Sequence, residues 1–360
     1  MASISLCMIV KNEEKNLKTC LDSIHSLVDE IIIVDTGSTD KTKEIANEYT
    51  NLIYDFRWVD DFSKARNFAF SKGSCEYQMW LDADEILSPK SIKDFFALSR
   101  LDANIDVVTM KQVNFFHGEP SIFYARGRLF KRNKNYRWQD PVHEYITMTG
   151  KVFNSDIEIH HRGDESKDKS NRNLIIYENL LKNHVKFSPR QLYYYARELK
   201  DHLQYEKAAK YFTLFLDTKK GWSEDNIATC YSLAIIFREL KQEEKILPIL
   251  LSSFIYDTPR AEICSEIGYF YKRRKDKEKS LRWFLLATTL EKPDTMGFLL
   301  ADYWGYIPNL ECCVIYWELG NLEKAIEFNE RAAIFKPNSP SVIQNRTFFE
   351  NQLSNASKDC

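Results

Sequence analysis

The run Asp82-Ala83-Asp84-Glu85 places three carboxylates within four residues, directly after an apolar segment. An apolar segment of this length predicts a buried strand over residues 77–82, and carboxylates at its end repel one another unless a cation or hydrogen bonds compensate. Hard oxygen ligands of this kind suit Mg²⁺ or Mn²⁺, which often bridge to a substrate phosphate. The alternative interpretation is an acidic turn that merely ends a strand.

The elements around this run decide between the two interpretations. Strands are predicted at residues 4–10, 30–35, 52–55 and 77–82, and helices follow them, including a short one over 63–71. This order predicts a mainly parallel sheet with helices on both faces. Ligands bind such sheets beyond the carboxyl ends of the strands, where Val10, Asp35 and Asp82 fall. The convergence of three strand ends favours a binding site.

Beyond about residue 170 the pattern becomes helical, and a short phrase recurs. Its copies are Glu206-Lys207-Ala208, Glu244-Lys245-Ile246, Glu278-Lys279-Ser280 and Glu323-Lys324-Ala325, at intervals of 38, 34 and 45 residues. One of these intervals equals the 34-residue tetratricopeptide period, and the other two are longer. An aromatic insertion over residues 296–308 accounts for the long last interval, and we interpret it as packing, with the lining of an acceptor groove as the alternative. Such repeats stack into a surface able to hold a peptide or a second copy.

Composition limits the function classes. The 360 residues allow two domains, and 50 basic against 52 acidic residues give a net charge of −2, with no basic excess of the kind that nucleic-acid binding needs. The eight cysteines include no CxxC pair, which argues against a zinc site and favours a reducing cytosol. No run approaches eighteen uncharged residues, so we expect no membrane span and a cytoplasmic protein.

Three motifs, in order, resemble the family 2 glycosyltransferases of GT-A fold: the segments 8–14 and 33–40, and Asp82-Ala83-Asp84. The resemblance covers residues 3 to 165 and implies an α/β nucleotide-diphospho-sugar transferase fold, followed here by an all-α tetratricopeptide-like domain. Segments 61–67 and 142–144, with repeats appended, are similar to bacteriocin peptide S-glycosyltransferases of the sublancin type. The expected division is 1–168 for the transferase domain, 169–189 for a helical linker, 190–350 for the repeats and 351–360 for a polar tail.

The resemblance also implies roles for individual residues in binding a UDP-sugar donor. Val10, Asn12 and Glu13 would line the nucleotide pocket, Asp35 would meet the uracil or ribose, and Arg66 would reach the base or the diphosphate. Lys11 departs from the family, whose members often carry an aromatic residue there that stacks on the base. Within Asp82-Ala83-Asp84, Asp82 would hold the ribose hydroxyls and Asp84 would ligate the metal ion. Alternation puts His160 and His161 on opposite faces of a strand, so one of the two is expected to face the site. The resemblance to the family favours His161 as the further metal ligand.

The acceptor must lose a proton, which requires a carboxylate or histidine within hydrogen-bonding distance. The segment 138–144 offers Glu144 as the expected base, with Asp140 and His143 as alternatives, although His143 and Glu144 could instead only order this loop. Arg126 and Arg128 could pin phosphate oxygens or face solvent, and Trp80 is expected in the core.

The sequence thus predicts a metal-dependent inverting glycosyltransferase that uses a UDP-sugar, with UDP-glucose expected. The favoured acceptor is a ribosomal peptide, modified on a cysteine thiol or a serine hydroxyl, and the repeats could also serve homodimerisation. The alternatives are transfer to a lipid-linked or cell-envelope glycan, and an inactive repeat-protein scaffold.

Overall fold

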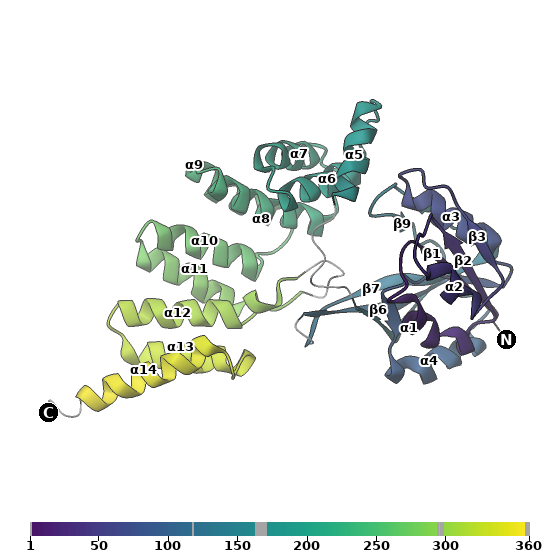
Figure 1. Cartoon of the computed structure of the whole chain (residues 1–360). Helices are drawn as coiled ribbons and strands as arrows, with labels where there is room; N and C mark the ends of the chain where they lie inside the picture. Colours follow the sequence, from purple (N-terminus) through teal and green to yellow (C-terminus); the bar gives the residue numbers. More distant parts are fainter. Residues whose placement is uncertain (1, 117–118, 163–170, 294, 296–298, 357–360) are drawn as a thin grey trace. The chain divides into compact units, whose positions relative to one another are not determined.

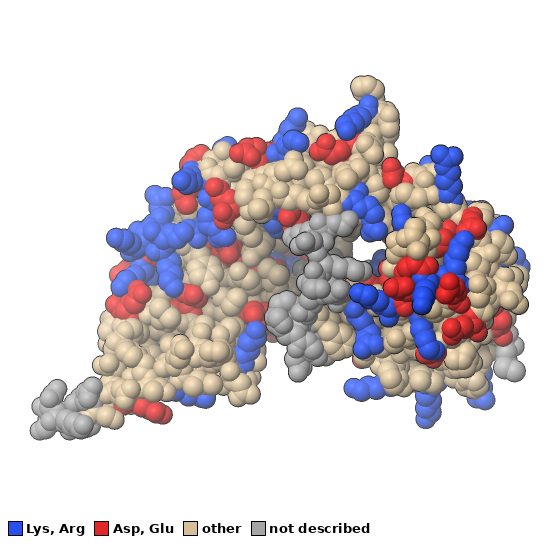
Figure 2. Space-filling model, in the orientation of Figure 1, with Lys and Arg blue, Asp and Glu red and all other residues tan. Residues whose placement is uncertain are grey.

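The chain folds into two compact units, Met1–Lys186 and Phe187–Cys360 (Figure 1). The computed structural model describes residues 2–116, 119–162, 171–293, 295 and 299–356. The amino-terminal unit is α/β and the carboxyl-terminal unit is helical, as the sequence predicts. On the face of each unit that Figure 2 shows, acidic and basic side chains of the described residues lie interspersed. No helix of the described residues is long and apolar enough to cross a membrane.

The amino-terminal unit alternates strands and helices. Its strands are β1 (Ile4–Val10), β2 (Glu30–Asp35), β3 (Ile53–Asp55), β4 (Tyr77–Met79), β5 (Glu85–Leu87), β6 (Val107–Phe116), β7 (Glu119–Lys131), β8 (Trp138–Gln139), β9 (Tyr145–Ile146) and β10 (Val152–His161). Its helices are α1 (Leu17–Asp22), α2 (Thr42–Asn47), α3 (Phe62–Lys72), α4 (Ile92–Ala97) and α5 (Arg172–Lys182).

One eight-stranded sheet, in the order β3-β2-β1-β4-β7-β6-β10-β5, forms the core of the described part of this unit. Four of its seven pairings are parallel, and β7 runs antiparallel to both β4 and β6. Side chains alternate along β1, so Leu6 and Met8 join the apolar cluster on one face while Cys7 joins the cluster on the other. Burial on both faces explains why β1 and β2 are almost entirely apolar.

The strand predicted over residues 77–82 is too long, because β4 ends at Met79. Trp80 and Leu81 stay buried, but the chain then turns, and the backbone N–H of Glu85 donates to the carbonyl of Asp82 at 3.0 Å. The apolar pattern could not distinguish a buried extended segment from a paired strand. The Asp82-Ala83-Asp84 tripeptide therefore lies in a tight turn between β4 and β5.

The carboxyl-terminal unit consists of successive helices. They are α6 (Pro189–Asp201), α7 (Tyr205–Asp217), α8 (Ser223–Glu239), α9 (Glu243–Ser252), α10 (Ala261–Arg273), α11 (Lys277–Thr289), α12 (Tyr306–Glu318), α13 (Leu322–Phe335) and α14 (Pro340–Ala356). Helix α14 continues six residues past the expected end of the repeats at residue 350, and residues 357–360 of the expected tail lie outside the described residues.

The turns between paired helices repeat in structure as well as in sequence. Each contains a residue with left-handed backbone: Leu203, Lys241, Lys275 and Gly320, with φ of 59°, 58°, 60° and 78°. The next residue in each turn donates its N–H to a carbonyl five positions earlier, at 2.8–3.1 Å, which is the Schellman arrangement that ends helices. These residues are spaced by the same 38, 34 and 45 positions as the sequence phrases. The tetratricopeptide-like repeat is thereby confirmed.

The aromatic insertion is packed, as interpreted. Tyr303 lies 3.2 Å, between hydroxyl oxygens, from Tyr231, and it donates a hydrogen bond to Glu266 at 3.3 Å. Trp304 packs in the same apolar cluster as Tyr303, against the buried Ala287. Residues 296–298 of the insertion lie outside the described residues.

Glu262 on α10 gives the helical unit a predicted pH dependence. Its side chain is 7% exposed, Oε2 has no hydrogen-bond partner among the described residues, and burial raises its pKa from 4.5 to about 7. Because folding raises this pKa, the contribution of Glu262 to the free energy of unfolding is most favourable below pH 4.5. This contribution is lost as the pH rises from 4.5 through 7. We expect Glu262→Gln to raise the free energy of unfolding by about 3 kcal/mol at pH 8.5, at about 1.4 kcal/mol per pKa unit, and to change it little at pH 4.5.

Urea unfolding of the full chain at the two pH values measures this difference. Glu278→Gln, an exposed position at the start of α11, is the control with the same change of charge. An equal effect of Glu262→Gln at both pH values would contradict the assignment.

Candidate active site

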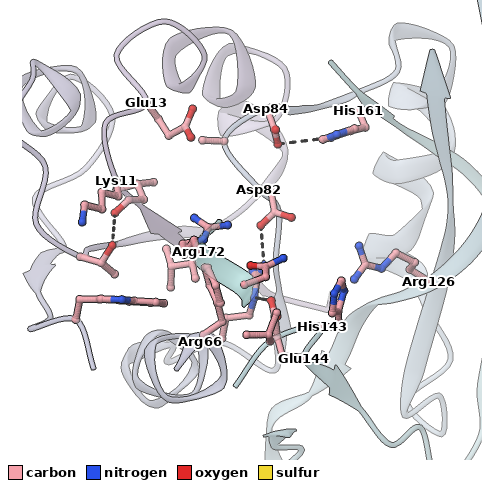
Figure 3. A pocket seen from close by; sticks show the side chains of 18 residues that line it. Lys11, Glu13, Arg66, Asp82, Asp84, Arg126, His143, Glu144, His161 and Arg172 are labelled. Atoms are coloured by element: carbon pink, nitrogen blue, oxygen red, sulfur yellow. Dashed lines mark hydrogen bonds and ion pairs between the residues drawn. The ribbon is translucent and has the colours of Figure 1, made fainter. Parts of the chain in front are cut away.

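A cavity of about 410 Å³ lies at the carboxyl ends of β1 and β2 and beside the turn after β4 (Figure 3). Its lining residues are Ile9, Val10, Lys11, Glu13, Thr36, Trp58, Phe62, Arg66, Asp82, Ala83, Asp84, Arg126, Val142, His143, Glu144, His161, Arg172 and Asn173. All belong to the amino-terminal unit. The position is the one that the strand order predicts for a ligand site.

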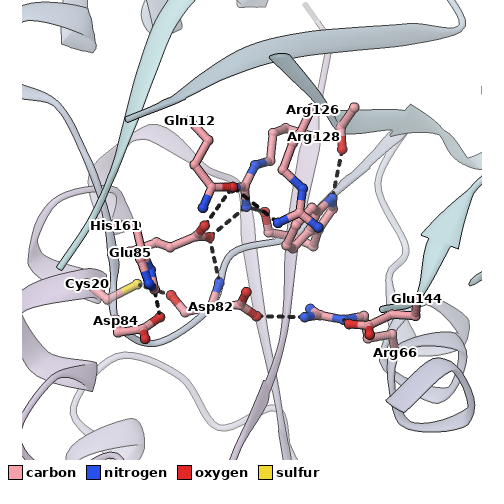
Figure 4. Close-up of polar contacts among 12 residues, drawn as sticks. Cys20, Arg66, Asp82, Asp84, Glu85, Gln112, Arg126, Arg128, Glu144 and His161 are labelled. Carbon is pink, nitrogen blue, oxygen red and sulfur yellow. Dashed lines mark hydrogen bonds and ion pairs between the residues drawn. The ribbon is translucent and has the colours of Figure 1, made fainter. Parts of the chain in front are cut away.

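Arg66 of α3 joins two of the expected site residues. Its Nε donates to Glu144 at 2.6 Å and one terminal nitrogen donates to Asp82 at 2.7 Å, and the guanidinium lies 4.8 Å from the ring centres of both Trp80 and Trp138 (Figure 4). Burial opposes the charge of Arg66, but the two carboxylates more than offset it and raise its pKa. Burial likewise opposes the charge of Asp82, yet Arg66 holds the pKa of that carboxyl at about 2. Asp82 is therefore an anion at any physiological pH, with 36% of its side chain open to solvent.

Asn67, the next residue, fixes the loop that carries Glu144. Its side-chain amide donates to the carbonyl of Trp138 and accepts from the N–H of the same residue, both at 2.9 Å, as a neighbouring strand would. The loop includes Asp140 and His143 in left-handed backbone, with φ of 66° and 53°, which costs energy for residues other than glycine. Successive residues of a helix point about 100° apart, so Arg66 and Asn67 reach different parts of one loop.

Glu85, the third carboxylate of the acidic run, turns away from the cavity. It is 1% exposed, and Arg128 donates to its two oxygens at 2.6 Å each. Glu85 also accepts from the backbone N–H of Asp82 at 3.0 Å, which fixes the turn. Arg128 is fully buried, so it neither pins phosphate nor faces solvent, and both sequence interpretations of it are wrong.

Asp84 is left as the carboxylate of the turn that no arginine pairs with among the described residues. Its Oδ1 lies 3.5 Å from Nδ1 of His161, which is buried and has no hydrogen-bond partner among those residues. The Asp84 carboxylate raises the pKa of His161 against the effect of burial. His160 instead lies 3.0 Å from the carboxylate of Glu158 and packs on Phe115. The strand alternation thus brings His161, and not His160, to the cavity.

The donor atoms of Asp84 and His161 fit a divalent ion that shares its coordination with a substrate. Within the described residues, no group of three or more His, Cys, Asp or Glu side chains could hold a metal alone. Mg²⁺ and Mn²⁺ commonly take one or two protein ligands and complete their shell with phosphate oxygens and water. The unsatisfied nitrogen of His161, 3.5 Å from a carboxylate that no arginine pairs with among the described residues, matches that kind of site.

The structure does not bring every expected residue to the cavity. Asp35 is 2% exposed and accepts from the N–H groups of Gly37 and Ser38, so its carboxylate shapes the turn after β2. Asn12 accepts from the N–H of Thr39 at 2.8 Å and ties the two strand-end loops together. Neither of them lines the cavity, and nor does Asp140, whereas Val10, Glu13 and Ala83 do.

Several lining residues were not predicted. Trp58 and Phe62 meet edge to face with ring centres 4.7 Å apart, and the guanidinium of Arg172 lies 4.5 Å from the ring of Phe62. Trp58 follows the short strand β3, where no recognisable motif marks it. Its place in the cavity depends on how the loop before α3 folds back, which periodicity does not report.

A sheet with parallel strands and a charged cavity beside an Asp-x-Asp turn are the features expected of a nucleotide-sugar transferase domain of GT-A type. Residues 5–160 match the family model described as Glycosyl transferase family 2. The amino-terminal unit is therefore a family 2 glycosyltransferase domain, and tetratricopeptide-like helices follow it.

Two relatives are similar to parts of this chain. A TPR repeat-containing protein of Synechococcus elongatus is 37% identical over 150 residues, covering 41% of this chain and 36% of that protein. The SPbeta prophage-derived glycosyltransferase SunS of Bacillus subtilis is 26% identical over 283 residues, covering 74% of this chain and 65% of SunS. The match thus spans less than two thirds of either relative. Among solved structures, the TPR protein YrrB is similar over 49% of this chain and 82% of its own, with 18% identity and a TM-score of 0.37.

The double ion pair of Arg66 predicts a large loss of stability when the guanidinium is removed. We expect Arg66→Met to lower the free energy of unfolding by about 3–5 kcal/mol, because Asp82 and Glu144 lose their shared partner. Lys64→Met on the same helix removes an exposed ion pair with Asp61 and should cost less than about 1 kcal/mol. Urea unfolding followed by tryptophan fluorescence compares the two, and equal losses would contradict the central role of Arg66.

Proposed function

We propose that this chain is a metal-dependent inverting glycosyltransferase that transfers a hexose from a UDP-sugar, with UDP-glucose expected, to a cysteine thiol or serine hydroxyl of a peptide. One observation carries the proposal. The turn after β4 presents Asp84 beside His161, while Arg66 and Arg128 neutralise the two neighbouring carboxylates.

The charges around the cavity support a need for a cation when the donor binds. The described lining holds four carboxylates and four basic groups, whose formal charges cancel: Glu13, Asp82, Asp84 and Glu144 against Lys11, Arg66, Arg126 and Arg172. A nucleoside diphosphate sugar adds two negative charges, and the leaving nucleotide gains a third. A divalent ion held by Asp84 and His161 would act as a Lewis acid that stabilises this charge.

The walls of the cavity supply the remaining contacts to the donor. Asp82 stays ionised and keeps an open surface, so it can accept hydrogen bonds from ribose hydroxyls. Val10, Glu13 and Ala83 form the adjoining wall. Asp35 and Asn12 would act indirectly, because they hold the loops that form this wall.

Glu144 is the proposed base. It lines the cavity, and since Arg66 occupies only Oε1, the other oxygen remains for the acceptor proton. The acceptor sulfur or oxygen forms the new bond to the anomeric carbon as its proton passes to Glu144. The bond from that carbon to the diphosphate oxygen breaks, and its electron pair leaves on that oxygen. A thiol, whose pKa is near 8.5, can be deprotonated by a weaker base than an alcohol needs. His143 is the alternative base, because it also lines the cavity.

The proposal of a peptide acceptor rests on the presence of the helical unit and on the similarity of this chain to SunS. The match to SunS runs over 283 residues, which is longer than the amino-terminal unit and therefore includes helices of the second. Together with the motif resemblance, this supports an acceptor of the peptide class. A cytoplasmic location, in keeping with the free thiols of the seven described cysteines, and a homodimer through the repeats complete the proposal.

Removal of the metal ligand tests the donor half. Wild-type protein with UDP-glucose and a peptide pool should release UDP only with Mn²⁺ or Mg²⁺, and Asp84→Asn should lower that rate by roughly 100-fold or more. Asp22→Asn, at an exposed position outside the cavity lining, is the control. Unchanged UDP release in Asp84→Asn, or with EDTA, would refute the metal site. A wild type that neither binds nor releases UDP would instead indicate a scaffold.

Intact-mass analysis tests the acceptor half. A cysteine-bearing peptide that receives a hexose should lose the modification when that cysteine becomes alanine, because no other side chain then offers a thiol. The serine variant of the same peptide shows whether a hydroxyl suffices. Modification of glycans alone, with every peptide unchanged, would contradict the proposal.

A further inference from the structure

We propose that Arg126 binds oxygens of the donor diphosphate, at a position separate from the pair formed by Asp84 and His161. This inference rests on the proposed function, because it assigns a contact to the same nucleotide-sugar donor. The sequence left two interpretations of Arg126, a contact to phosphate oxygens and a solvent-facing position, and the surroundings of its guanidinium favour the first.

Arg126 is held in place without being neutralised. It lies on β7 opposite Met110 of β6 and lines the cavity. One terminal nitrogen donates to the side-chain oxygen of Gln112 at 3.1 Å, and the guanidinium lies 4.6 Å from the ring centre of Trp80 (Figure 4). An amide and an indole fix the position of a guanidinium but bring no negative charge.

The neighbouring arginines are paired, and Arg126 is not. Arg66 has two carboxylate partners and Arg128 has both oxygens of Glu85. Among the described residues, no carboxylate forms an ion pair with Arg126. The oxygen of Gln112 also accepts from Arg128 at 2.9 Å, so it holds two like charges side by side.

The pairing leaves the cavity polarised. Arg66 with its two carboxylates carries a net charge of −1, whereas Arg126, Arg128 and Glu85 together carry +1. Burial, and then the charge of Arg128, lower the pKa of Arg126, which shows that the surroundings oppose this positive charge. Structures keep such a charge at a cost mainly where a ligand compensates for it.

A diphosphate fits this position better than a neutral sugar does. A guanidinium has five N–H groups, and the contact to Gln112 uses one side of it, so others remain for two oxygens of one phosphate. Charge on the diphosphate grows as the bond to the anomeric carbon breaks, and a fixed guanidinium next to it stabilises that change. An anionic group of the acceptor has the same chemistry, and the experiment separates the two sources.

Binding of uridine and of UDP to the full chain tests the assignment. We expect Arg126→Met to weaken UDP binding about 10- to 100-fold, both with Mn²⁺ and with EDTA, because a charged hydrogen-bond donor is lost. Uridine, which has no phosphate, should bind as it does to wild type, and that result also reports a folded cavity. Arg132→Met, exposed just beyond β7, is the control and should bind UDP normally.

Arg126→Lys keeps the stem and the charge but loses the planar fork, so it should weaken UDP binding by less than Arg126→Met does. It serves as the test variant if Arg126→Met does not fold. Wild-type affinity for UDP in both variants would overturn the assignment, and a raised KM for the acceptor alone would assign the anion to the acceptor and overturn it equally. A wild type that binds neither uridine nor UDP would overturn the proposed function as well, which distinguishes the two failures.

Discussion

The indole of Trp80 is the centre on which the charged groups of the site depend. Three guanidinium groups lie around it, with Arg66, Arg126 and Arg128 at 4.8, 4.6 and 3.9 Å from the ring centre. The ring nitrogen donates to the carbonyl of Gly127 at 2.9 Å, so the indole is itself fixed to β7. An aromatic face attracts cations, and here it gathers three of them where the chain also turns with three carboxylates. The distribution of those carboxylates among the arginines decides which charges the cavity presents.

The sheet topology makes this cluster possible. Strand β7 runs antiparallel to β4, with Met79 opposite Leu129, so the N–H of Trp80 can still donate to the carbonyl of Arg128 at 3.3 Å. Strand β6 on the other side of β7 supplies Gln112. A wholly parallel sheet would not bring these segments together in this register. The antiparallel strand β7 is therefore part of the site, although it carries none of the recognised motifs.

The sequence predicted the elements better than the directions of their side chains. Strands β1 and β2 are recognisable in the sequence as apolar runs because both of their faces are covered. Strict alternation also put His160 and His161 on opposite faces of a strand. Asp35 was expected in the cavity, but the two N–H groups of its own turn take up its carboxylate. Glu85 belongs to the run of three carboxylates for which a cation or hydrogen bonds were expected, and it is an arginine 43 positions away that pairs with it in the core. Such outcomes depend on which distant group supplies a charge or a donor, and no local pattern contains that information.

The guanidinium of Arg66 has one further consequence. It binds Asp82, on the proposed donor side of the cavity, and Glu144, on the proposed acceptor side, through separate nitrogens. A ligand that changes the interaction of Arg66 with one carboxylate also changes the interaction of Arg66 with the other carboxylate. Thermodynamic linkage makes such an effect reciprocal: the free energy by which a bound nucleotide alters proton uptake at Glu144 equals that by which the proton alters nucleotide affinity. The two halves of the reaction would then be cooperative through a single side chain, without any movement of the backbone.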